Sequence, residues 1–177
     1  MGFSDSSALL KIALILLPLA LILHIVGIAT PNWSSYSASS GAVSTSLSYG
    51  LWKLCVEVNG VSECANYPNV QDWVKACQAF GIIGVLAVAG AAILEVLCTI
   101  VLSKATHKVA FIAAAITAFV GAASIILSAI IWSAKVTEFG NTELDLSWSF
   151  GLSITGGVLA GIGGILVALD LCQNTDQ

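Results

Sequence analysis

Four long stretches with almost no charge dominate this sequence of 177 residues. They lie at about residues 8–29, 76–102, 109–134 and 146–169, and each is long enough to cross a bilayer as a helix, which takes roughly 20 residues. Because the hydrocarbon core offers no water to backbone N–H and C=O groups, such stretches must be helical. The sequence therefore predicts a single domain of four membrane spans, with the lipid bilayer as its first partner.

The first stretch has a competing interpretation as a secretory signal peptide. Lys11, the apolar run after it and Gly27-Ile28-Ala29 resemble the charged start, core and small-residue cleavage site of such a peptide. The run from Ile12 to Thr30 is longer than the roughly 7–15 residues of a signal core, which favours a retained span.

Composition excludes several classes of function. Charged residues make up only 9% of the chain, the net charge is −4, and no basic stripe is present, so nucleic-acid binding has no basis. The sequence contains no catalytic or metal-binding motif such as HExxH or CxxC. We therefore expect neither enzyme activity nor a cofactor.

The segment after the first span predicts a β-hairpin. Asn59-Gly60 between alternating apolar residues is a strong signal for a type I′ turn, and this turn sets Cys55 opposite Cys64. The pair falls at a non-hydrogen-bonded position, where Cα atoms approach to about 4.5 Å, just within the reach of a disulfide. Such a bridge would stabilise the hairpin by roughly 2.5–3 kcal/mol; two reduced cysteines are the alternative.

Alternation along the same hairpin predicts one apolar face, formed by Trp52, Leu54, Val56, Val58 and Val61. Such a face must be covered by further strands, by the tops of the helices or by a neighbouring molecule. Further strands are expected from the serine-rich stretch at residues 34–48.

The connecting segments set the topology. A long loop at 30–75 and a medium loop at 135–145 alternate with a short turn at 103–108 and a tail at 170–177. Lysines lie on both sides, so the positive-inside rule decides little. A disulfide in the long loop requires an oxidising compartment, so we place both loops outside the cell. This predicts a plasma-membrane protein with both termini in the cytoplasm.

The long loop also carries a tryptophan, a Gly-Leu-Trp triplet and two cysteines: Trp33, Gly50, Leu51, Trp52, Cys55 and Cys64. With four spans and a long first loop, this pattern resembles the superfamily of claudins, peripheral myelin protein, epithelial membrane proteins, lens fibre membrane intrinsic protein and calcium-channel γ subunits. The resemblance implies a mainly α membrane protein, a left-handed four-helix transmembrane bundle with a small antiparallel extracellular β-sheet. It also implies that the tryptophan and the triplet anchor the sheet against the bilayer surface.

Resemblance to claudins implies cell–cell adhesion or a barrier at tight junctions, with self-association within one membrane (cis) and across two (trans). It also implies paracellular pores, for which the excess of acidic residues in the loops predicts a mild cation preference. The candidate pore and contact residues are charged or aromatic: Glu57, Glu63, Asp72, Lys75, Glu138, Phe139, Glu143 and Asp145.

Two departures favour an alternative. Gln177 does not suit the apolar pocket of a PDZ scaffold, and only Lys75 could replace the basic residue that claudins carry near the second span. The alternative is a regulatory or membrane-organising tetraspan of the myelin, epithelial or lens type, or a channel auxiliary subunit. Its partners would be other claudin-like or channel proteins.

Several residues in or near the spans are further candidates. Glu95 and His24 are polar groups inside spans, with either a specific role or a role in helix packing. Cys98 and Cys172 lie near cytoplasmic span ends and are candidates for palmitoylation, with unmodified cysteines that face the membrane as the alternative.

Other span residues predict packing or position in the bilayer. Trp73, Trp132 and Trp148 are expected in an interfacial aromatic belt. Small residues spaced by four, such as Gly157 and Gly161, predict close packing between helices, within the bundle or between copies.

Overall fold

The computed structural model describes residues 6–41, 43–100, 108–139 and 144–173. Four of its helices are long and apolar enough to cross a membrane, in agreement with the predicted four spans. They are α1 (Ala8–Ala29), α2 (Asp72–Ile100), α3 (Lys108–Lys135) and α4 (Trp148–Gln173). A 3-10 turn, η2 (Val136–Phe139), extends α3. The predicted turn at 103–108 lies outside the described residues except for Lys108.

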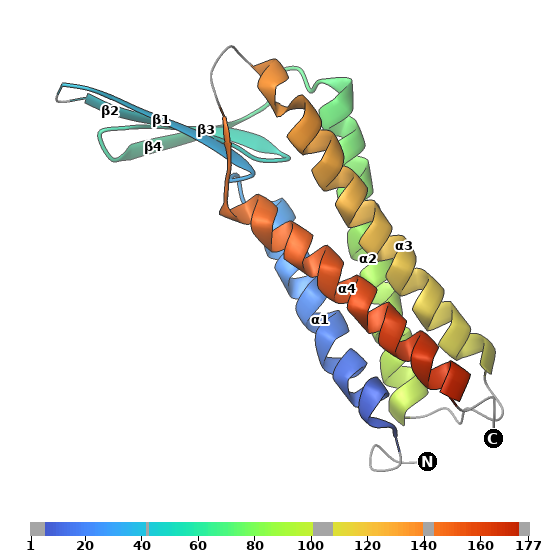
Figure 1. Cartoon of the computed structure of the whole chain (residues 1–177). Coiled ribbons are helices and arrows are strands. Elements are labelled where there is room, and N and C mark those ends of the chain that lie inside the picture. Colours follow the sequence, from blue (N-terminus) through green and yellow to red (C-terminus); the bar gives the residue numbers. More distant parts are fainter. Residues whose placement is uncertain (1–5, 42, 101–107, 140–143, 174–177) are drawn as a thin grey trace.

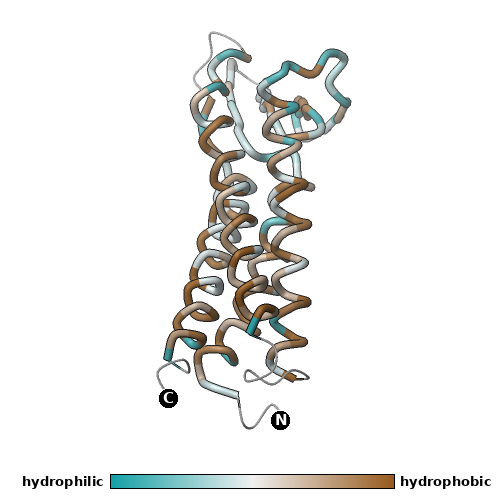
Figure 2. Tube along the Cα trace, turned by 90° about the vertical axis from the view of Figure 1, so that its right-hand side faces the viewer, coloured by the Kyte–Doolittle hydropathy of each residue, from teal (hydrophilic) through white to brown (hydrophobic). Residues whose placement is uncertain are grey.

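The helices form a bundle in which each packs against two others, in the cyclic order α1, α2, α3, α4. Figure 1 shows α1 beginning and α4 ending at one end of this bundle, with a β-sheet at the other end. Figure 2 shows hydrophobic residues along the length of the helices and hydrophilic ones concentrated at the sheet and the bundle ends. The predicted mainly helical membrane fold is confirmed.

Small residues let the helices approach one another closely. A Cβ added at Gly156 of α4 would lie 2.7 Å from the carbonyl oxygen of Ala20 in α1, and one at Gly157 would lie 2.9 Å from Ile125 in α3. Gly161 lies beside Ala122, whose Cβ would be 3.7 Å from an added methyl group. The predicted small-residue stripe therefore serves packing within the bundle.

Two element boundaries differ from the sequence prediction. Helix α2 begins at Asp72, before the predicted start at Ala76, and its acidic first turn suits the positive end of a helix dipole. Leu146 was predicted to open the fourth span, and this is wrong. It belongs to a short strand, β5 (Asp145–Leu146), because the N–H of Ser147 donates to the carbonyl of Trp33 and holds the segment extended.

The sheet is antiparallel and has five strands in the order β4-β3-β2-β1-β5. Its first four strands are β1 (Ser34–Ser40), β2 (Val43–Tyr49), β3 (Lys53–Val58) and β4 (Val61–Asn66). The serine-rich stretch thus supplies strands, as predicted. Strand β5 comes from the loop before α4 and was not predicted, since two residues are too few to show a period.

The predicted hairpin is confirmed in its turn, register and disulfide. Asn59 and Gly60 have φ angles of 48° and 84°, as a type I′ turn requires, and Val58 pairs with Val61. Cys55 lies opposite Cys64, and the two are joined by a disulfide with Cα atoms 4.1 Å apart. The bridge ties β4, one of the two edge strands, to β3 in the interior of the sheet.

The two faces of the sheet have different chemistry. The register places one set of side chains together, which we call the apolar face: Tyr36, Leu47, Leu54, Val56, Val58 and Val61. The opposite set, the serine face, contains Ser35, Ser37, Ser39, Ser44, Ser46, Ser48, Cys55 and Glu57. The predicted apolar face is therefore present within β3 and β4, whereas Trp52 lies in the turn before β3.

Candidate functional site: the junction of sheet and bundle

The turn that contains Gly50 forms the closest contact between the sheet and the segment that leaves α1. A Cβ at Gly50 would lie 2.5 Å from the Cα of Pro31 and 3.0 Å from the carbonyl oxygen of Thr30. Both atoms belong to backbone that cannot easily move. Glycine is thus required here for close approach, not for an unusual backbone angle.

Two side chains bind the carbonyl groups of this turn. The hydroxyl of Tyr67 donates to the carbonyl of Gly50 at 2.7 Å, and the amide of Gln78 in α2 donates to the carbonyl of Leu51 at 2.7 Å. Burial raises the pKa of Tyr67, which keeps the phenol protonated as a donor. Leu51 itself is fully buried, with its side chain against Gly81 of α2. Sequence reasoning did not identify Tyr67 or Gln78, because a single polar residue in a loop or at a helix start carries no pattern.

Trp33 connects α1 to the sheet and is fully buried. Its indole N–H donates to the carbonyl of Gly27 in α1 at 2.8 Å, and its own N–H donates to the carbonyl of Tyr49 in β2 at 2.8 Å. The ring meets Trp132 and Phe150 edge to face, with centroids 5.2 and 5.6 Å away. Trp33 therefore contacts α1, α3, α4 and the sheet.

Trp132 is a correction to the sequence analysis, which placed it in an interfacial belt. It is fully buried, and its indole donates to the hydroxyl of Ser34 in β1 at 2.9 Å. The sequence signal is the spacing: Trp132 follows the polar residues Ser124 and Ser128 at intervals of four along an apolar span, and all three are buried on one side of α3. Trp148, another tryptophan of the predicted belt, is 53% exposed, as expected at an interface.

Phe139 lies in η2 at the centre of an aromatic cluster and is half-buried. It stacks on Tyr49 and Tyr67, at 4.8 and 5.9 Å between centroids, and it also contacts Trp73 and Trp132, at 5.0 and 5.9 Å. Its contacts attach the loop after α3 to the sheet. Any contact of Phe139 with a partner would thus use only the exposed part of its ring.

The charged candidates do not gather into one cluster. Lys75 pairs with Asp72 at 2.9 Å, and Lys135 pairs with Glu138 at 2.6 Å. Because these pairs are exposed, they add little to stability.

Three further acids were predicted as pore or contact residues. Glu57 and Glu63 are both exposed but lie on opposite faces of the sheet, and Asp145 is exposed in β5. Glu143 lies outside the described residues. Within the described ranges, no group of three or more His, Cys, Asp or Glu side chains is arranged to hold a metal ion.

His24 joins three helices inside the bundle. Its Nε2 donates to the carbonyl of Gly81 in α2 at 3.0 Å, so Nδ1 accepts from the hydroxyl of Ser153 in α4 at 2.9 Å. Gly84 leaves room for the ring, since a Cβ there would lie 3.0 Å from Nε2 of His24. Gly156 lets α4 approach the backbone of α1, since a Cβ there would lie 3.0 Å from the backbone nitrogen of His24. This arrangement corresponds to the packing role considered for His24.

Two buried acids lie near the other end of the bundle. Glu95 is fully buried and accepts a hydrogen bond from the hydroxyl of Thr99, one turn further along α2, at 3.0 Å. Asp170 was assigned to the tail, which is a further correction: it lies within α4 and is fully buried. The sequence analysis ended the span at Leu169 because the charge of the next residue, Asp170, was taken as the boundary of the span.

The three free cysteines differ in access. Cys98 is buried against Phe111 and neighbouring residues, which disfavours acylation of its thiol, whereas Cys172 is exposed and remains a predicted site. Cys77 is buried and exchanges hydrogen bonds with Ser128. Its thiol donates to the Ser128 carbonyl at 3.5 Å, and the Ser128 hydroxyl donates to the Cys77 carbonyl at 2.9 Å.

Comparison with known proteins gives one family. The model described as PMP-22/EMP/MP20/Claudin family matches residues 6–167 of this chain. A search of curated proteins gives no significant match. The matched range includes α1, α2 and α3, the sheet, the junction described above and α4 as far as residue 167.

Proposed function

Because this chain belongs to the PMP-22/EMP/MP20/Claudin family, we propose that it is a claudin-like adhesion and barrier protein that self-associates through its sheet. In this proposal the sheet lies outside the cell, both termini lie in the cytoplasm, and copies meet at cell–cell contacts. Self-association takes place within one membrane and between two apposed membranes.

The observation that carries the proposal is the unprotected edge of the sheet. All six residues of β4 (Val61–Asn66) are exposed, and the strand has β3 as its neighbour on one side only. An edge strand offers unpaired N–H and C=O groups to a further chain. Beside this edge, the apolar face leaves Val58 43% and Val61 69% exposed, which favours contact with another protein over contact with water.

Expression in cells that lack junction strands tests the proposal. We expect the full-length chain to aggregate such cells and to form strands visible by freeze-fracture. Val61→Lys should reduce aggregation several-fold, because an ammonium on an edge strand opposes pairing. Ser44→Lys is the matched control, since it adds the same charge to an exposed site on β2, an interior strand. Diffuse surface label without aggregation for the unmodified chain would contradict the proposal.

A mild cation preference of any paracellular pore is the finer part of the proposal. Glu63 is the acid best placed for it, because it lies on the apolar face, opposite Val56, and is exposed. Glu63→Lys should lower the sodium-to-chloride permeability ratio of an epithelial monolayer, while Glu57→Lys on the serine face should change it less. If the unmodified chain and Glu63→Lys gave equal sodium-to-chloride permeability ratios, Glu63 would not line the pore.

One observation favours the alternative, a regulatory or membrane-organising tetraspan. Phe139, a predicted contact residue, is half-buried under four aromatic rings of the same chain, which limits what the loop after α3 can offer across a cell–cell gap. Under this alternative, the expressed protein co-purifies with a channel or another claudin-like protein and forms no strands.

A further inference from the structure

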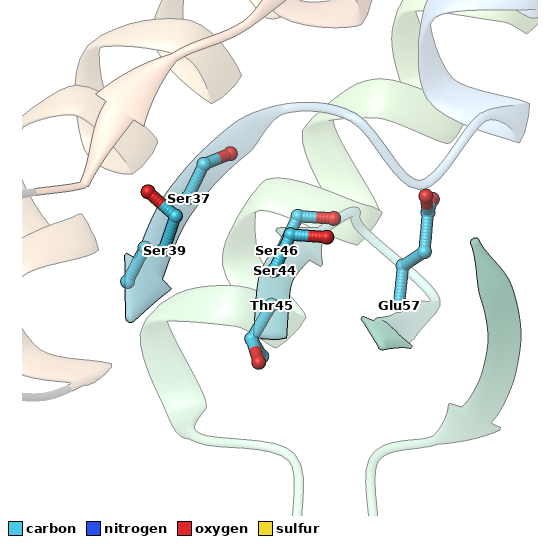
Figure 3. Close-up of a pocket in the computed structure, with 7 residues that line it drawn as sticks. Ser37, Ser39, Ser44, Thr45, Ser46 and Glu57 are labelled. Carbon is cyan, nitrogen blue, oxygen red and sulfur yellow. The ribbon is translucent and has the colours of Figure 1, made fainter. Parts of the chain in front are cut away.

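The serine face of the sheet contains a shallow hollow of about 290 Å³. Its polar lining comes from Ser37, Ser39, Ser44, Ser46 and Glu57. Figure 3 shows these four hydroxyls and the carboxylate on one side of the strands, whereas the side chain of Thr45 points to the other side. The hollow thus combines several donors and acceptors with one carboxylate, at a volume near the roughly 300 Å³ lower limit for small-ligand sites.

The serine face looks back toward α1. Trp33 directly precedes β1, and the residues at alternate positions from it, Ser35 and Ser37, lie on one side of that strand. The indole of Trp33 reaches the carbonyl of Gly27 in α1, which locates that side. On the opposite side, Tyr49 stacks on Phe139, beyond the end of α3.

Two exposed tryptophans give the level of the membrane surface at the base of the sheet. Trp148, the first residue of α4, is 53% exposed, and Trp52, in the turn before β3, is 36% exposed. Exposed tryptophan side chains favour the boundary between hydrocarbon and headgroups. From this level the strands project sideways beyond the ends of α1 and α4 (Figure 1). With the bundle in a bilayer at this level, the serine face would lie over lipid, within reach of a headgroup layer roughly 5–8 Å thick.

We propose that this hollow binds the headgroup of an outer-leaflet phospholipid, with choline preferred. Glu57 would attract the quaternary ammonium, and the serine hydroxyls would donate to the phosphate. The exposed carboxylate of Glu57 beside serine hydroxyls from β1 and β2 suits a zwitterion better than an anion. The proposal uses the extracellular placement of the sheet that the proposed function also uses, but it does not depend on self-association.

Quenching by spin-labelled lipid tests the position of the hollow. The full-length chain carrying Cys172→Ser would receive a thiol-reactive fluorophore at Ser46→Cys or at Thr45→Cys, two neighbouring residues on opposite faces. In nanodiscs that hold one copy in phosphatidylcholine with a nitroxide on the headgroup, we expect quenching at Ser46→Cys to exceed that at Thr45→Cys at least three-fold. Equal quenching would overturn the proposal. A second result would also overturn it: a probe at Ser46→Cys that is protected from quenching only in nanodiscs holding two copies, because the serine face would then contact protein.

The lipid preference has its own test. Protein extracted from vesicles of equal phosphatidylcholine and phosphatidylglycerol should retain more of the choline lipid. Glu57→Gln should reduce this enrichment about two- to five-fold, the range expected for an exposed charge pair. Glu63→Gln, which removes the same charge from the opposite face, should leave it unchanged. Equal effects of the two substitutions would overturn the role of Glu57. Neither lipid measurement depends on cell aggregation, so this proposal and the proposed function can fail separately.

Discussion

Trp33→Ala is expected to lower the free energy of unfolding by about 3–5 kcal/mol, the usual cost of truncating a fully buried tryptophan to alanine. The substitution removes the edge-to-face contacts with Trp132 and Phe150 and leaves the carbonyl of Gly27 without its indole donor. Since these groups join α1, α3 and α4 to the sheet, we expect loss of surface expression. Thermal unfolding of the purified chain in detergent, together with surface biotinylation of cells, measures both effects.

Trp33→Phe separates packing from hydrogen bonding. It keeps an aromatic ring but removes the N–H, so the added cost of the lost hydrogen bond should be about 1 kcal/mol. Trp148→Ala is the matched control, because that side chain is 53% exposed and its loss should change stability by less than about 0.5 kcal/mol. A cost for Trp33→Ala no larger than that of Trp148→Ala would show that Trp33 does not support the junction.

Gly50→Ala should cost about 3 kcal/mol, at the upper end of the range for overpacking. Its Cβ would lie 2.5 Å from the Cα of Pro31, so the turn must move away and weaken the hydrogen bonds from Tyr67 and Gln78. We expect a lower melting temperature by roughly 6–12 °C in the same detergent assay.

The control for Gly50→Ala is Gly151→Ala in α4. An added Cβ there meets nothing within 4 Å, and alanine favours a helix over glycine by roughly 0.5–1 kcal/mol. This variant should be as stable as the unmodified chain or more so. If both substitutions had the same effect, the close approach at Gly50 would not limit the fold.

The sequence predicted the helices and the hairpin for different reasons. Long apolar stretches indicate membrane spans, because crossing a bilayer takes roughly 20 consecutive residues with few or no charges. The turn Asn59-Gly60 fixed the pairing of Cys55 with Cys64, because one turn type determines every partner in a two-residue hairpin.

The junction could be predicted only in part. The resemblance gave Trp33 and Gly50, whereas Tyr67, Gln78 and Trp132 act through contacts between segments far apart in the chain. Trp132 and Asp170 also show why hydropathy misplaces residues at span ends. A tryptophan or an acid near the end of a span reads as a boundary, yet in this fold each faces the interior of the bundle and is fully buried.

The short pairing of β1 with β5 has a mechanical consequence. Strand β1 follows α1, and β5 leads into α4, so the ladder from Ser34 to Leu146 joins the adjacent ends of two membrane helices. A bilayer that thins or thickens changes the preferred tilt of the helices within it. A relative tilt of α1 and α4 must then either shear this ladder or turn the sheet with it. The orientation of the sheet would in that way respond to the thickness of the membrane below.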